Sequence, residues 1–207
     1  MHAMLPLIPS GPQAAPCAVA LGASAGGVKA LRTIIAALPA DLPAAVFVVL
    51  HLDPNGRSLL PTLLAAGTSL RVRDVLDAGA IERGTVYVAI PDRHLLVSDG
   101  RLRLTVSEPV HHVRPSVDRL FESIALNWLT AAVGVILTGT GADGASGIAA
   151  IKQGGGHTIA QDPSEAEYSS MPRAAIATGS VDAVLPLHSI APAIARAAAR
   201  AAAGRAA

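Results

Sequence analysis

Runs of apolar residues alternate with amphipathic stretches along most of the chain, and this alternation limits the possible folds more than any other feature. Runs such as "CAVALGA" and "AAVFVVLH" carry no polar face, which is typical of strands covered on both sides of a parallel sheet. Strands are expected at 17–23, 44–51, 85–90, 132–139, 157–162 and 181–187. Helices between them are expected at 28–38, 58–65, 115–129, 145–152 and 171–179. We therefore predict an α/β fold with a doubly wound, mostly parallel sheet and helices on both faces.

One segment has a different pattern. In "HLLVSDGRLRLTV", apolar and polar residues alternate on either side of Asp99-Gly100, which predicts an antiparallel hairpin near an edge of the sheet. Hydrophobic residues make up 51% of the chain and aromatic residues 2%. Small aliphatic side chains must therefore fill the core, which suits helices packed closely on a sheet and argues against disorder.

The length of 207 residues suits one sizeable domain. We expect a flexible lead over residues 1–16, the folded domain over 17–192 and an alanine-rich helical tail over 193–207. The arginines of the tail are expected to form a solvated face.

Bulk charge and composition exclude several classes of function. The formal net charge of +1 gives no reason to expect nucleic acid or an anionic membrane as partner. No apolar run is long enough to span a bilayer, and the first residues lack the pattern of a secretory signal. The single cysteine, Cys17, is interpreted as a buried strand thiol, which fits a reducing compartment. We therefore expect a cytoplasmic protein.

Three polar side chains lie where three of the strongest predicted strands end. Ser24 follows "AVALGA", His51 ends "VFVVLH", and Asp143 follows "GVILTGTGA". In a doubly wound sheet, the carboxyl ends of the strands meet at one edge, where functional residues collect. Together the three have the residue types of a serine hydrolase triad.

The chemistry requires each of these types. A serine hydroxyl attacks an ester only if a base accepts its proton, and an imidazole needs a carboxylate to fix its tautomer. Asp143 precedes a predicted helix, whose N-terminal dipole favours its ionised form. Ser24 lies in a similar place within "GASAGG", where unpaired N–H groups could stabilise an oxyanion and the glycines permit a tight turn. Taken singly, however, each residue also fits a structural role, as a helix cap, a turn residue or a strand-end histidine.

Two other classes of enzyme compete with this interpretation. Gly139, Gly141 and Gly144 match G-x-G-x-x-G between a strand and a helix, and Asp162 lies near where a ribose-binding acid would fall. Asp143 inside that loop would repel a pyrophosphate, which weakens a dinucleotide site. An α/β-hydrolase would place the histidine last in the chain, so that His157 or His188 would have to be the base. That order fits poorly with a serine at position 24.

Four separated motifs resemble the catalytic domain of chemotaxis protein-glutamate methylesterases, the CheB type. They are "GASAGG", "RPSVDRLFESIA", "LTGTGADGASGIAAIKQGGGHTIAQD" and "MPRAAIATGSVDAVLPL". The resemblance runs in order from about Ala18 to Ile190. It implies an esterase that removes methyl groups from the glutamyl γ-methyl esters of chemoreceptors, releasing methanol. Some family members also deamidate receptor glutamines.

The resemblance assigns roles to individual residues. The serine, histidine and aspartate of the family triad match Ser24, His51 and Asp143. By analogy, the backbone N–H groups of Ala25 and Thr140 would be the oxyanion donors. The family often has a methionine where this chain has Thr140.

The family also implies a substrate-binding surface, which Tyr168 and Met171 would border. Arg114, Ser116 and Asp118 belong to a family motif, and helix capping explains them as well as substrate contact would.

No cofactor or metal is expected, since His94, His111 and His112 do not form a cluster with ligand spacing. The expected partner is the methylated cytoplasmic domain of a chemoreceptor. No receiver domain precedes Ala18, so we expect a free-standing domain that is either always open or regulated by another protein in trans. A scaffold in a sensory array with a vestigial site is the non-enzymatic alternative.

Overall fold

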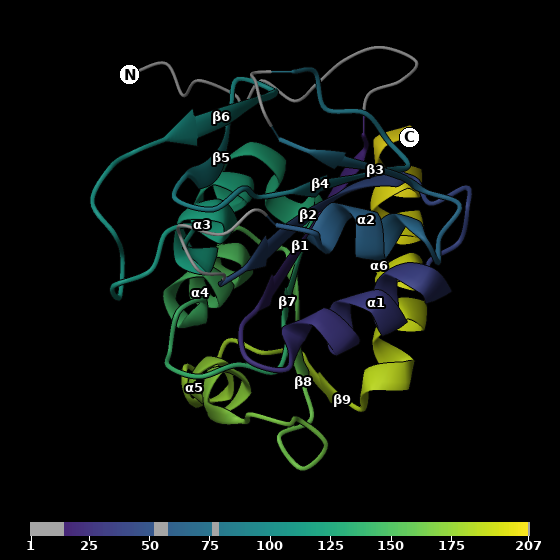
Figure 1. Ribbon diagram of the computed structural model, residues 1–207. Coiled ribbons are helices and arrows are strands. Elements are labelled where there is room, and N and C mark those ends of the chain that lie inside the picture. Colours follow the sequence, from purple (N-terminus) through teal and green to yellow (C-terminus); the bar gives the residue numbers. More distant parts are fainter. Residues whose placement is uncertain (1–14, 52–57, 76–78, 207) are drawn as a thin grey trace, which may run out of the picture.

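A computed structural model describes residues 15–51, 58–75 and 79–206. At its centre lies a parallel sheet (Figure 1). Its strands are β1 (Cys17–Ala23), β2 (Ala44–Leu50), β3 (Arg71–Asp74), β4 (Thr85–Val88), β7 (Ala132–Ile136), β8 (His157–Gln161) and β9 (Ala183–Leu185). They pair in the order β3-β4-β2-β1-β7-β8-β9, so the chain builds the sheet first on one side of β1 and then on the other. This is the doubly wound topology, and the predicted fold class is confirmed.

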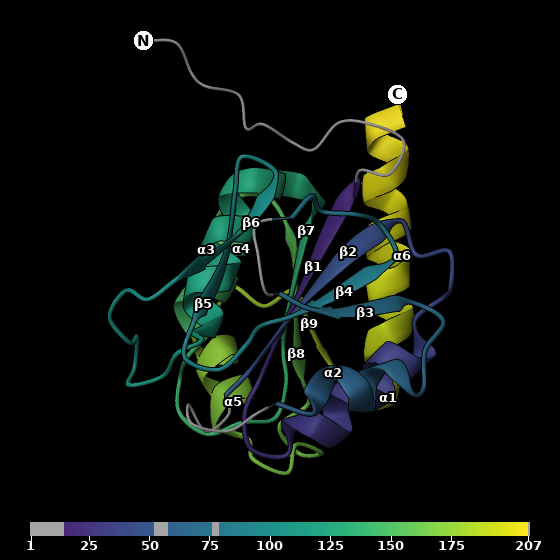
Figure 2. The same ribbon diagram turned by 45° about the horizontal axis from the view of Figure 1, so that its top comes forward.

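Helices cover both faces of the sheet, as Figures 1 and 2 show. On one face lie α1 (Gly27–Ala37), α2 (Leu60–Ala65) and α6 (Leu187–Ala206). On the other lie α3 (Val117–Trp128), the 3₁₀ turn η1 (Leu129–Ala131), α4 (Ala145–Gln153) and α5 (Ser170–Ala177). The predicted hairpin is present as β5 (His94–Ser98) and β6 (Arg101–Thr105), which pair as a separate two-stranded sheet. This sheet packs against α3, where Ser123 Oγ accepts a hydrogen bond from Val97 N at 3.0 Å.

The central strand β1 has two different faces. Val19 and Leu21 point into the core beneath α1 and α6, whereas Ala18 and Ala20 face α3. Gly22 continues the row of small residues. A Cβ added at Gly22 would lie only 2.4 Å from a methyl carbon of Val117. The small face of β1 therefore allows the first turn of α3 to approach the sheet directly beside the strand's carboxyl end.

Gly22→Ala should consequently destabilise the fold by about 1–3 kcal/mol, because the new methyl group overlaps Val117. Val117→Ala alone should also destabilise, because it removes buried methyl groups. In the double variant the two changes share one space, so the combined loss should be smaller than the sum. Urea unfolding of the four proteins in a double-mutant cycle measures this coupling. Simple additivity would contradict the close packing.

The structure corrects three details of the prediction. Strand β3 was not predicted, because its sequence "RVRD" is mostly charged and exposed, as suits an edge strand. The predicted lead over 1–16 falls mostly outside the described residues, but Ala15 is buried and its carbonyl accepts a hydrogen bond from Trp128 Nε1. Helix α6 begins at Leu187 and continues through the boundary predicted after residue 192. Ile194 and Ala198 lie in the core, because the apolar side of this helix packs against the sheet.

Two smaller expectations concern individual features. Cys17 is buried in β1, as predicted. Within residues 15–51, 58–75 and 79–206, no helix combines the length and the apolar character needed to cross a bilayer.

Candidate functional site

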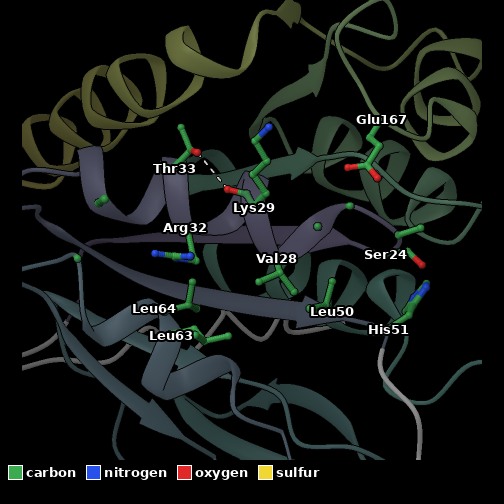
Figure 3. Close-up of a pocket in the computed structure, with 15 residues that line it drawn as sticks. Ser24, Val28, Lys29, Arg32, Thr33, Leu50, His51, Leu63, Leu64 and Glu167 are labelled. Carbon is green, nitrogen blue, oxygen red and sulfur yellow. Dashed lines mark hydrogen bonds between the residues drawn. The ribbon is translucent and has the colours of Figure 1, made fainter.

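The three residues of the predicted triad follow the carboxyl ends of the neighbouring strands β2, β1 and β7. Ser24 comes directly after β1 and His51 directly after β2, and Ala23 and Leu50 are register partners. His51 N donates to the Ala23 carbonyl at 3.2 Å, which fixes the two strand ends side by side. Figure 3 shows the Ser24 hydroxyl directed toward the ring of His51. Parallel pairing of β1 and β2 is therefore what brings serine and histidine together.

The His51 ring is oriented by Asp143, which lies in the loop between β7 and α4. His51 Nε2 and Asp143 Oδ2 are 2.8 Å apart, and the aspartate is only 3% exposed. A carboxylate accepts, so Nε2 carries the ring proton of neutral His51 and Nδ1 is the nitrogen without a proton. The two ring nitrogens thus have the opposite assignment to that in chymotrypsin-like proteases.

Asp143 is held by the N-terminus of α3. Its Oδ2 accepts from Val117 N at 2.6 Å, and its Oδ1 accepts from Asp118 N at 3.1 Å and from Ser116 Oγ at 2.8 Å. Burial alone would raise the pKa of Asp143. The hydrogen bonds from His51, Val117, Asp118 and Ser116 outweigh burial and lower this pKa below its ordinary value. Asp143 is therefore ionised wherever an imidazole can act as a base.

The turn that carries Ser24 is anchored to the end of β7. Gly26 adopts a left-handed conformation with φ +74°, which a glycine accommodates without strain. Ser24 N donates to the Thr138 carbonyl at 3.0 Å. The Thr138 hydroxyl donates to the Ala25 carbonyl at 3.0 Å and accepts from Tyr168 N at 2.9 Å. Thr138, which the sequence analysis did not single out, thus ties the serine turn to the segment before α5.

Two backbone N–H groups beside Ser24 remain available for an oxyanion. Ser24 N and Gly139 N are engaged by the carbonyls of Thr138 and Tyr168. In contrast, neither Ala25 N nor Thr140 N has a hydrogen bond to another of the described residues. The predicted donors are thus free to bind substrate, and their role remains a prediction.

The two predicted groove residues differ in exposure. Tyr168 is 42% exposed, so a contact between its ring and substrate stays a prediction. Met171 is buried, and a Cβ at Gly139 would lie 2.2 Å from its sulfur. Met171 therefore packs beneath the loop after β7, where a side chain at position 139 would leave it no room, and its contact with substrate stays a prediction.

The dinucleotide alternative is contradicted at the N-terminus of α4. A pyrophosphate would need the unpaired N–H groups there, but Gly144 N and Gly147 N already donate to Asp118 Oδ1, at 2.9 and 2.7 Å. The proposed ribose-binding acid, Asp162, accepts from the backbone and hydroxyl of Ser164 in a local turn. A buried carboxylate therefore occupies the place where phosphate would bind.

The alternative bases do not reach the serine. His157 begins β8, at the opposite edge of the sheet from Ser24, and pairs with Asp182 at 3.3 Å. His188 lies in the first turn of α6. Among residues the structure describes, His51 is the histidine that lines the same cleft as Ser24.

His94 and His111 have structural partners. Ser116 N donates to Nδ1 of the fully buried His94, whose Nε2 donates to the Glu108 carbonyl. His111 Nε2 lies 3.4 Å from Asp118 Oδ2. The described parts of the chain contain no group of three or more histidine, cysteine or acidic side chains placed to hold a metal ion.

The motif at 114–118 was open to two interpretations, substrate contact and helix capping. In the structure, its residues make structural contacts. Arg114 Nε donates to Asp92 Oδ1 at 2.9 Å, and its Nη1 donates to the carbonyls of Val106 and Ser107. Ser116 caps α3 by accepting from Arg119 N. Arg114 nevertheless borders a small cavity of about 150 Å³ that His51 also lines.

A larger cleft of about 670 Å³ runs from Ser24 and His51 along α1 and α2 (Figure 3). The charged residues that line it are Lys29, Arg32 and Glu167. Its apolar lining includes Val28, Ala36, Leu50, Leu63 and Leu64. These cleft residues were not predicted from the sequence. Lys29 and Arg32 share one side of α1 because they are three residues apart, but Glu167 carries no such signal.

Comparison with known proteins finds close relatives. A family model described as CheB methylesterase matches residues 19–194. A protein-glutamate methylesterase/protein-glutamine glutaminase from Symbiobacterium thermophilum is 46% identical over 180 residues, which are 86% of this chain and 50% of that protein. One from Burkholderia orbicola is 43% identical over 190 residues, covering 90% of this chain and 56% of the relative. The chain thus spans about half the length of these curated relatives.

A solved structure agrees with them. The Thermotoga maritima CheB methylesterase catalytic domain superposes with a TM-score of 0.83 and 33% identity, over 87% of this chain and 97% of that domain. A shorter relative from Leptospira interrogans, 38% identical over 175 residues, is matched over 91% of its length. The similarity therefore extends over a whole catalytic domain.

Proposed function

This chain belongs to the CheB methylesterase family, as its motifs predicted, and we propose that it hydrolyses glutamyl γ-methyl esters in the cytoplasmic domains of chemoreceptors, releasing methanol. The observation that carries the proposal is that the Ser24 hydroxyl is directed toward the ring of His51, which is hydrogen-bonded to the buried Asp143. Such an arrangement is suited to nucleophilic attack on an ester. It lies at a cleft open enough for a side chain of a protein substrate to enter.

The proposed reaction has two halves. Ser24 Oγ attacks the ester carbonyl carbon while His51 Nδ1 takes the hydroxyl proton, and Asp143 stabilises the imidazolium through Nε2. The N–H groups of Ala25 and Thr140 bind the oxyanion. When the tetrahedral intermediate collapses, methoxide takes the proton from His51 and leaves as methanol. Water then gives a proton to His51 and attacks the glutamyl-serine ester, which restores Ser24 and releases a glutamate carboxylate.

The cleft supports a polypeptide as substrate. Its apolar lining and its charged Lys29 and Arg32 extend well beyond the serine, so residues next to the esterified glutamate can be bound along α1. The names of the relatives add glutaminase activity, and we propose that the same serine also attacks receptor glutamine amides, releasing ammonia. We therefore also propose a cytoplasmic location, where receptor domains of this kind would be met. Regulation by a partner acting in trans stays a prediction.

Hydrolysis of a methylated receptor cytoplasmic domain in ¹⁸O-labelled water tests the proposal. Acyl transfer through Ser24 should release unlabelled methanol and leave one ¹⁸O atom in the new glutamate carboxylate. Mass spectrometry of both products measures this, and the unmethylated receptor domain is the control. Label in methanol, or no methanol from a folded protein, would contradict the proposal.

A further inference from the structure

The N-termini of α3 and α4 exchange carboxylates. Asp143, which precedes α4, accepts from the first backbone N–H groups of α3, those of Val117 and Asp118. In return, Asp118 Oδ1 accepts from Gly144 N and Gly147 N at the start of α4, at 2.9 and 2.7 Å. Both carboxylates are 3% exposed. Each helix thus carries the anion that satisfies the other helix's N-terminal donors.

This exchange acts on the triad through one peptide group. Gly144 N belongs to the peptide bond that directly follows Asp143, so Asp118 holds the backbone of the triad acid. The Asp118 N–H holds its carboxylate as well, at 3.1 Å. The two helices are pressed together at Gly147, where a Cβ would lie 2.5 Å from Phe121 Cβ. Asp118 therefore restrains both the backbone that follows Asp143 and one oxygen of its carboxylate.

The position is electrostatically demanding for Asp118. Burial raises its pKa and the charge of Asp143 raises it further, whereas the hydrogen bonds from Gly147 and Gly144 and the nearby His111 act against this. His111 Nε2 lies 3.4 Å from Asp118 Oδ2. Two like charges near one another are unfavourable unless both are bound by donors. Keeping Asp118 charged beside Asp143 therefore lowers the stability of the folded state, and a neutral side chain capping α4 would not have this effect.

We propose that Asp118 is a positioning residue for the triad, which fixes Asp143 in hydrogen-bond reach of His51 by capping α4. The proposal rests on the proposed esterase function for its kinetic consequence, but its structural consequence can be measured without substrate. Without Asp118, two buried N–H groups lose their acceptor and the loop that carries Asp143 is free to move.

The kinetic test compares Asp118→Ala, Asp118→Asn and wild type in the methanol-release assay. Asp118→Ala should lower kcat up to about 100-fold, as expected for a misplaced catalytic group, while KM changes little because the cleft is untouched. Asparagine keeps an acceptor oxygen but loses the charge, so Asp118→Asn should be intermediate. Asp182→Asn is the matched control, because Asp182 also accepts backbone and side-chain donors but lies away from the site. It should keep the wild-type kcat.

The second readout is the proton on His51 Nε2, followed by NMR in protein without substrate. A firmly held Asp143 should protect this proton from exchange in wild type and in Asp182→Asn. Protection should fall in Asp118→Asn and further in Asp118→Ala. A folded Asp118→Ala with wild-type kcat and protection would overturn the proposal. If that variant does not fold, Asp118→Asn decides, and wild-type values of both quantities would overturn it. If protection falls in the Asp118 variants but the wild-type protein releases no methanol, the result would refute the proposed function and leave the positioning role of Asp118 standing.

Discussion

Ser24→Ala should abolish methanol release, with kcat falling by at least about 10⁴-fold. The reason is that no other hydroxyl replaces the one directed at His51 (Figure 3), and loss of the serine removes the covalent route entirely. Residual activity would come from oxyanion stabilisation and substrate binding alone. Methanol release from a methylated receptor domain, measured at saturating substrate, gives the comparison.

The Ser24→Ala protein should fold normally. The Ser24 hydroxyl has no hydrogen bond to another described residue, so removing it should change the free energy of unfolding by no more than about 0.5 kcal/mol. Ser98→Ala is the matched control and should keep full activity, because Ser98 lies at the end of β5 and its hydroxyl donates to Asp99 within the hairpin. If Ser24→Ala retained appreciable methanol release, Ser24 would not be the nucleophile.

Asp143→Asn should cost nearly as much, about 10⁴-fold in kcat. An asparagine amide can donate to His51 Nε2, which selects the tautomer with its proton on Nδ1. That nitrogen then faces Ser24 as a donor and cannot accept the hydroxyl proton. The loss should appear mainly in kcat, because Asp143 does not line the cleft. Steady-state kinetics of methanol release, with kcat and KM determined separately, measures it.

Asp162→Asn provides the control for the change of charge. Asp162 is half-buried, and among the described residues its side chain accepts hydrogen bonds from Ser164 alone. This variant should keep wild-type kinetics. An Asp143→Asn variant with nearly normal kcat would mean that His51 does not depend on the carboxylate for its tautomer.

The order of strands and helices could be predicted from the sequence because its signals are local. A strand covered on both faces reads as an unbroken apolar run, as in β1 and β2, and each helix shows its own periodicity. Edge strand β3 could not be recognised in this way, since a strand exposed to solvent does not need apolar residues. The second half of α6 was taken for a tail, because alanine and arginine give little periodic contrast although Ile194 is buried.

The candidate triad could also be predicted, since parallel strands must place their carboxyl ends together. Ser24, His51 and Asp143 each follow a strong strand, and the family motifs independently pointed to the same residues. What the motifs left open was whether Ser116 and Asp118 cap helices or contact substrate. The hydrogen bonds of both side chains to α3, α4 and Asp143 favour a structural role.

The sequence by itself determined the fold class, most of the elements and the three residues at the strand ends, because each depends on neighbours along the chain. Tertiary structure alone decided how those residues face one another. His51 and Asp143 are 92 positions apart, and the exchange of carboxylates between α3 and α4 joins residues 25 or more positions apart. Such contacts depend on strand order, on the close approach at Gly22 and on which donors remain buried without a partner, and no local pattern encodes these.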